Sequence, residues 1–159
     1  MDRRRILIAG IGASLVIAMW EMIVEAVIPG GAGFFGTPVA IGATIVRDLQ
    51  GSANPIPFNV VALVLGLMGH MMNSVILAVI FALIVTRLAP SAAGTIGLGM
   101  AWGVVVFAMM RFVVAPAIDP LMLNLNAAVF LAGHLMWGAA LGFIWTRFGS
   151  TASERSFAR

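Results

Sequence analysis

The chain contains two histidines, His70 and His134, and each follows a glycine inside a long apolar run. Imidazole nitrogens ligate metal ions and haem iron, and they exchange protons near neutral pH. Three further ionisable residues, Glu21, Glu25 and Arg111, stand in apolar segments of the same kind. Ionisable groups in such surroundings are costly, so they usually face a bundle interior and mark a functional site. These five residues are the candidates for chemistry.

The composition indicates an integral membrane protein. Of the 159 residues, 62% are hydrophobic and only 9% are charged, whereas a soluble domain carries roughly 25% charged residues. The lipid bilayer is therefore the expected partner. The nine arginines lie at the ends of apolar runs rather than in a basic patch, so nucleic-acid binding is not expected. The absence of cysteine excludes disulfides and thiolate ligands.

Four segments are long enough to cross the hydrocarbon core, which takes about 20 apolar residues as a helix. They cover residues 6–28, 60–85, 95–115 and 127–146. The first segment is longer than the h-region of a signal peptide, so we expect it to be retained as a helix. The sequence thus predicts an all-α, polytopic membrane protein whose single domain spans residues 1–148. Residues 149–159 are expected to form a cytoplasmic tail.

The connection between the first two spans contains signals for one more helix, at about residues 38–50. Thr37 and Pro38 are typical of a helix start, and Gly51 is typical of a stop. A helix of this length cannot span a bilayer. We expect it to lie in the outer membrane interface.

The arginines predict the orientation, because cytoplasmic loops of membrane proteins carry an excess of positive residues. If the helices alternate in direction, only Arg47 and Arg111 lie on or near one side. The other seven lie on the opposite side: Arg3, Arg4, Arg5, Arg87, Arg147, Arg155 and Arg159. Both termini are therefore expected in the cytoplasm. In this orientation all five candidate residues fall in the outer half of the bundle.

Helical spacing groups small residues beside the histidines. Residues four apart share a helix face, which predicts one face with Glu21 and Glu25. It also predicts two stripes, Gly66–His70–Ser74 and His134–Gly138–Gly142. Small residues one turn from an imidazole leave room for a neighbouring helix backbone or for a flat cofactor.

Several stretches, taken in order, resemble a group of small four-helix bacterial membrane proteins of uncharacterised function, similar to the YagU-like inner-membrane proteins. The stretches are Trp20–Glu25, Phe35–Pro38, Gly69–Ser74, Val114–Pro116 and Gly133–Gly138. The resemblance implies a four-helix fold in a bacterial inner membrane. It singles out Glu25, His70 and His134, and it implies no established activity.

Three functional hypotheses follow from the candidate residues. His70 and His134 could ligate a haem b, with Arg111 meeting a propionate, in an electron-transfer or accessory subunit. Alternatively, Glu21, Glu25, His70 and His134 form a ligand set for iron, manganese or zinc, with copper conceivable beside the nearby methionines. A third hypothesis is a proton-responsive site that titrates near neutral pH.

Structural interpretations stand beside each hypothesis. Histidines in membrane helices often form hydrogen bonds across an interface, and Arg111 could neutralise Glu21 or Glu25. The glycine stripes are typical of close helix packing, and the tryptophans are typical of interfacial belts. No catalytic residue is predicted, so an enzyme is less expected than a structural accessory subunit without a ligand. A larger membrane complex or a homo-oligomer remains open.

Overall fold

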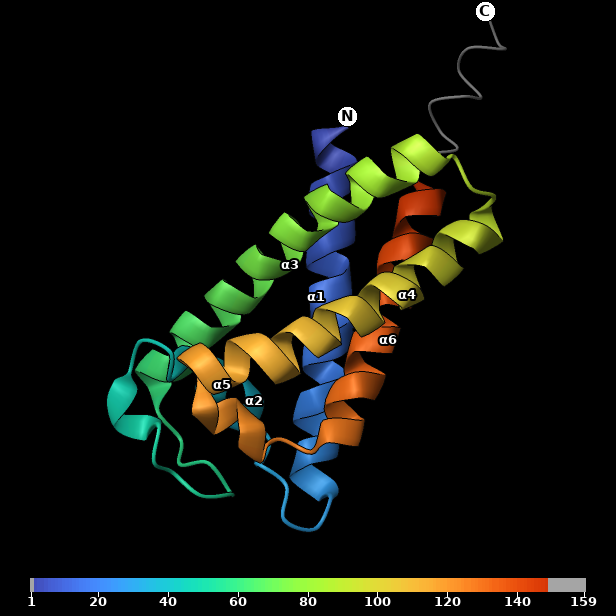
Figure 1. Cartoon of the computed structure of the whole chain (residues 1–159). Coiled ribbons are helices and arrows are strands. Elements are labelled where there is room, and N and C mark those ends of the chain that lie inside the picture. Colours follow the sequence, from blue (N-terminus) through green and yellow to red (C-terminus); the bar gives the residue numbers. More distant parts are fainter. Residues whose placement is uncertain (1, 149–159) are drawn as a thin grey trace, which may run out of the picture.

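The computed structural model describes residues 2–148, and within them all regular secondary structure is helical (Figure 1). The long helices are α1 (Arg3–Val27), α3 (Val60–Leu88), α4 (Ala92–Met109) and α6 (Ala127–Arg147). A π-helical turn, η2 (Met110–Val114), continues α4 into α5 (Ala115–Ile118). Four helical stretches are long and apolar enough to cross a membrane, which confirms the all-α polytopic prediction. Their ends differ from the predicted ends by no more than three residues. The predicted tail, 149–159, lies outside the described residues.

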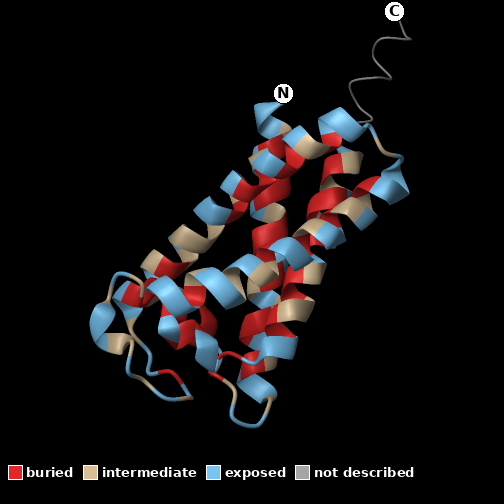
Figure 2. Ribbon diagram, viewed as in Figure 1, coloured by how far each residue is buried: buried red, intermediate tan, exposed pale blue. Residues whose placement is uncertain are grey.

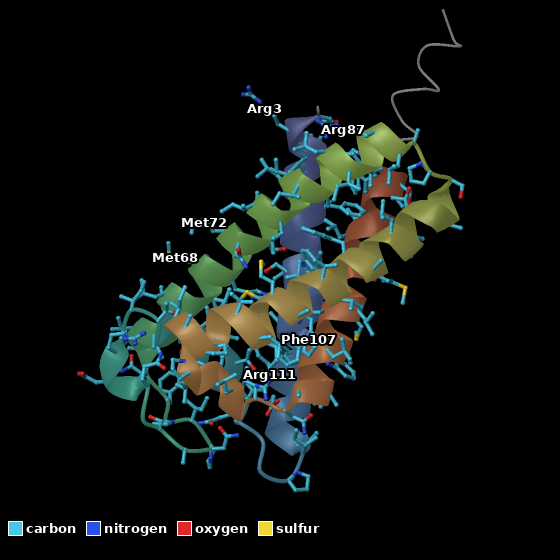
Figure 3. The ribbon with its side chains drawn as sticks, in the orientation of Figure 1. Arg3, Met68, Met72, Arg87, Phe107 and Arg111 are labelled. Atoms are coloured by element: carbon cyan, nitrogen blue, oxygen red, sulfur yellow. The ribbon has the colours of Figure 1, made fainter. Side chains whose placement is uncertain are left out.

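The two ends of the bundle are formed by different segments of the chain. The start of α1, the turn from α3 to α4 and the end of α6 lie together, at the terminal end of the bundle (Figure 1). Residues 28–59 and 119–126 lie at the opposite end, which we call the loop end. Arg3 and Arg87 lie at the terminal end, and Arg111 lies toward the loop end (Figure 3). Arg155 and Arg159 are outside the described residues.

Helices α4 and α6 pack backbone to backbone. A Cβ atom at Gly99 would lie 2.1 Å from the carbonyl oxygen of Gly138, and one at Gly103 would lie 2.2 Å from that of His134. A Cβ at Gly142 would similarly lie 2.6 Å from the oxygen of Thr95. A neighbouring helix backbone therefore fills the space beside the glycines of the His134 stripe.

The short helix between the first two spans, α2 (Gly36–Gly42), differs from the prediction of 38–50 in length and burial. Six of its seven residues are buried, and its first turn has no side-chain cap at Thr37. The cause is tight packing against α3. A Cβ at Gly42 would lie 1.9 Å from the Ala62 carbonyl oxygen, and one at Gly66 would lie 1.8 Å from that of Pro38. After Gly42 the chain turns and forms only a short 3₁₀ segment, η1 (Arg47–Leu49).

Helices α3 and α4 are joined by a short turn at the terminal end, and both slant across α1 and α6 toward the loop end (Figure 1). Buried residues run along α1, α2 and α6, while the outward faces of α3 and α4 are mostly exposed (Figure 2).

Candidate functional site

A cavity of about 380 Å³ is enclosed by residues of α1, α3, α4 and α6 and by residues of the loop end. Packed protein interiors contain few voids larger than a water molecule, and small-molecule sites typically measure roughly 300–1,000 Å³. The cavity is therefore large enough for a ligand. Its lining is formed by Ile17, Glu21, Ile41, Thr44, Ile45, Leu65, Gly69, His70, Asn73, Ser74, Leu77, Val106, Met109, Met110, Val114, Ile118, Asp119, Met122, Phe130, His134 and Trp137.

Glu21 on α1 contributes a carboxyl group to this lining. The residue is 2% exposed, and its Oε1 atom is buried without a hydrogen-bond partner. Gly133 on α6 provides the space for this oxygen, because a Cβ there would lie 3.1 Å from Oε1. Within the described residues, no group donates a hydrogen bond to Glu21. A buried acceptor without a partner costs about 1–3 kcal/mol.

The two histidines reach the same cavity from α3 and α6. His134 is buried, and its Nδ1 atom lies 2.8 Å from the carbonyl oxygen of Phe130. If Nδ1 carries the proton and donates to this carbonyl, Nε2 keeps a free lone pair. His70 is half-buried, and its Nε2 atom is buried without a partner. Glu21, His70 and His134 therefore line one cavity, although they stand on three different helices.

Beside the large cavity lies a small one of about 10 Å³, lined in part by Glu21, Thr37 and His70. The hydroxyl oxygen of Thr37 is also buried without a partner. Unsatisfied polar atoms from α1, α2 and α3 therefore gather around Glu21 and His70.

Ser74 and Trp137 fix one wall of the large cavity. Ser74 Oγ donates to the carbonyl oxygen of Gly10 at 2.7 Å and accepts from Trp137 Nε1 at 2.8 Å. These bonds tie α1, α3 and α6 together. Trp137 and Trp145 are only 3% and 4% exposed, so neither side chain faces lipid. Their indoles instead belong to the core.

Glu25, one turn after Glu21, has a different environment. Its Oε2 atom accepts from the backbone N–H of Ala32, and its Oε1 atom accepts from that of Asn126, both at 2.8 Å. Both carboxylate oxygens are therefore used to join the end of α1 to the following loop and to the start of α6. Glu25 does not line the large cavity, so the predicted pairing of Glu21 and Glu25 in one site is not formed.

Arg111 also lies apart from the cavity lining. Its Nη1 atom donates to the carbonyl oxygen of Leu123 at 3.0 Å, and it forms no ion pair with Glu21 or Glu25. Long arginine side chains near the end of a membrane helix commonly extend toward the interface. The ion pair considered from the sequence is therefore absent.

The predicted metal-ligand set does not come together. Within residues 2–148, no three His, Cys, Asp or Glu side chains are grouped so that they could hold a metal ion. Glu25 is already engaged by two backbone donors. Met68 and Met72, two residues to either side of His70, point away from the bundle and are each 64% exposed (Figure 3).

A second acid, Asp119, lies where the cavity meets the loop end. It is 2% exposed and accepts from Gln50 Nε2 at 2.5 Å and from Thr44 Oγ1 at 3.1 Å. Burial raises the pKa of Asp119 above its ordinary value, although the hydrogen bonds from Gln50 and Thr44 and the charge of Arg47 act in the opposite direction. Asp119 was not predicted, because nothing near it in sequence places it beside residues 44 and 50.

Other lining residues were detectable from helical spacing. Asn73 lies three residues after His70, Phe130 lies four residues before His134, and Trp137 lies three residues after it. Residues three and four apart share a face, so these three positions belong beside the histidines. The ring of Phe130 lies 4.4 Å from that of His134, edge to face.

The chain was compared with protein-family models, with curated proteins and with solved structures, and no match was found.

Proposed function

We propose that this chain is a multi-pass protein of a bacterial inner membrane, with cytoplasmic termini, whose cavity binds a small and mostly apolar molecule through Glu21, His70 and His134. Among the described residues, five arginines near the terminal end support the proposed orientation: Arg3, Arg4, Arg5, Arg87 and Arg147. The motifs that resemble the YagU-like proteins support the bacterial assignment.

One observation carries the proposal. Glu21 Oε1 and His70 Nε2 are buried without hydrogen-bond partners beside a cavity of ligand size. Buried polar groups are otherwise nearly always satisfied, and each exception requires an explanation. A polar group on a bound molecule would provide the missing partner, while the apolar walls would bind its body.

The alternative of purely structural polar residues accounts less well for these groups. Histidines and acids that join membrane helices do so through hydrogen bonds across an interface. Glu25 and Ser74 form such bonds, whereas the Oε1 atom of Glu21 and the Nε2 atom of His70 do not. Their retention in the bundle is better explained by a ligand than by helix association.

Haem b is the second candidate ligand, and the contact of His134 Nδ1 with the Phe130 carbonyl oxygen favours it. Histidines that ligate a metal usually donate the second ring N–H to a carbonyl or carboxylate, as His134 Nδ1 is positioned to do toward Phe130. His70, whose Nε2 is unpartnered, lines the same cavity. Against haem, the glycine stripes are filled by helix backbones, and Arg111 is directed to Leu123. Roles in electron transfer, proton response or a larger complex stay predictions.

The test uses a variant that fills the cavity. Gly69 lines the cavity, and a Cβ there would meet nothing within 4 Å, so Gly69→Leu occupies the ligand's space without a backbone clash. Gly97 on α4 has equally open surroundings but does not line the cavity, so Gly97→Leu is the matched control. Each protein is purified from membranes, extracted with organic solvent and analysed by mass spectrometry and absorption spectroscopy.

We expect wild type and Gly97→Leu to release the same small molecule, and Gly69→Leu to lack it. A Soret band in wild type that disappears in His70→Ala and His134→Ala would identify the ligand as haem. If the extracts of wild type and Gly69→Leu are identical, the proposed binding site is wrong.

A further inference from the structure

The cavity lining contains acidic residues but no arginine or lysine. Its ionisable lining residues, apart from the two histidines, are Glu21 and Asp119, and both are acids. Asp119 is satisfied by Gln50 and Thr44, whereas Glu21 has no partner. The chain contains no lysine, and Arg111 donates to the carbonyl of Leu123 outside the lining. The cavity thus offers an unpaired carboxyl group without a protein cation to neutralise it, and an isolated buried carboxylate is strongly unfavourable.

The walls around Glu21 suit a positively charged organic group. Phe130 and Trp137 contribute aromatic rings, whose faces attract cations. Three methionines, Met109, Met110 and Met122, contribute flexible and polarisable side chains that adapt to irregular apolar shapes. An anion would instead meet carboxyl groups and the negative faces of aromatic rings.

The cavity opens sideways between α3 and α4. Among its lining residues on these two helices, Met109 on α4 is 39% exposed, and Asn73 on α3 is also exposed. In a bilayer this opening faces lipid, and a polar Asn73 on such a surface is unusual. A molecule dissolved in the membrane would pass Asn73 on its way to Glu21.

We propose that the cavity accepts a hydrophobic organic cation, such as an alkyl or aryl ammonium, which enters from the bilayer between α3 and α4 and places its charge beside Glu21. This inference rests on the proposed function, because it names the class of ligand for the same cavity. Glu21 pairs with the cationic group, and Phe130 and Trp137 contact the apolar body.

The test compares two molecules of the same shape. Benzyltrimethylammonium is the cation, and neopentylbenzene, with carbon in place of nitrogen, is its neutral isostere. Binding of each to the full chain in phosphatidylglycerol nanodiscs is measured by equilibrium dialysis, with empty nanodiscs subtracted. We expect wild type to bind the cation about tenfold or more tightly than the isostere. The preference should disappear in Glu21→Gln and persist in Gly97→Leu, while Gly69→Leu should bind neither molecule.

Equal binding of the two molecules by wild type, or a preference that survives Glu21→Gln, would overturn the assignment of a cation. Equal binding would not contradict the proposed function, since the cavity would still bind a ligand. The proposed function is tested separately, by comparing the extracts of wild type and Gly69→Leu. No binding of either molecule also overturns the cation assignment.

Ammonium groups of lipids are a second source of the same chemistry. In phosphatidylcholine nanodiscs a lipid headgroup that occupies the site would compete with benzyltrimethylammonium and weaken its binding. Unchanged binding would support a free cation.

Discussion

Equally buried carboxyl groups have hydrogen-bond donors at the loop end, but the carboxyl group of Glu21 in the cavity leaves Oε1 without one. At the loop end, Glu25 accepts from two backbone N–H groups, and Asp119, where the loop end borders the cavity, accepts from Gln50 and Thr44. In the cavity, Glu21 lies one turn from Glu25 and is exposed to the same extent, 2%, yet its Oε1 has no partner. Burial alone therefore does not separate structural from functional acids here. The hydrogen-bond partners do.

The difference has a physical interpretation. The loop end holds long connections together, so each buried acceptor there contributes to stability. The cavity keeps unsatisfied groups and unfilled volume, both of which cost stability, and proteins retain such features mainly at functional sites. The comparison predicts which substitutions reduce stability and which do not.

The largest expected loss of stability follows Glu25→Ala. This change leaves the N–H groups of Ala32 and Asn126 without acceptors, at about 1–3 kcal/mol for each group. Glu25→Gln keeps one acceptor and should lose about half as much. The free energy of unfolding in detergent micelles measures both losses. If the Glu25→Ala protein is as stable as wild type, the claim that Glu25 stabilises the fold is wrong.

A smaller loss is expected for Gly99→Ala, which tests whether the cavity reflects loose packing of the whole bundle. Its Cβ would lie 2.1 Å from the Gly138 carbonyl oxygen, so α4 and α6 must separate, at about 1–3 kcal/mol. Gly97→Ala on the same helix meets nothing within 4 Å and should change stability by no more than about 0.5 kcal/mol. Thermal unfolding of the pair measures the difference, and equal midpoints would mean that α4 and α6 are not closely packed.

The smallest expected effect concerns pH and Asp119. Because burial raises its pKa in the folded protein, the native state binds this proton more tightly than the unfolded state does. The contribution of Asp119 to stability is therefore greatest below the ordinary carboxyl pKa and declines as the pH rises through the raised value. Asp119→Asn should remove that decline. Unfolding measured between about pH 4 and pH 7 checks this, and identical pH profiles would contradict it.

Most of the fold was predictable from the sequence, because membrane spans follow from the lengths of apolar runs. The helix at about 38–50 was predicted less well. Its end at Gly42 depends on a contact with Ala62, which no local signal in the sequence reveals. Thr37 and Gly51 carry local start and stop signals, but packing against α3 overrides them.

The candidate site was predicted in part. The alternating directions of the helices predicted a similar depth for Glu21, His70 and His134, and these three residues line one cavity. Spacing could not distinguish Glu21 from Glu25, since they are the same residue type on one face. The partners of Glu25 lie 7 and 101 residues away, so only the folded chain identifies them. Arg111 fell at the expected end of its helix, but the sequence did not show that it donates to Leu123.

The most direct test of the central claim is the stability of Glu21→Met measured beside Glu25→Ala. Methionine is apolar and similar in size to glutamate, so it removes an unsatisfied buried acceptor without opening a large space. Replacing such a group by an apolar one is neutral or stabilising. If Glu21 serves a ligand rather than the fold, the free energy of unfolding of Glu21→Met will equal that of wild type or exceed it by about 1–3 kcal/mol. A loss as large as that of Glu25→Ala would show that Glu21 is structural and would contradict the account.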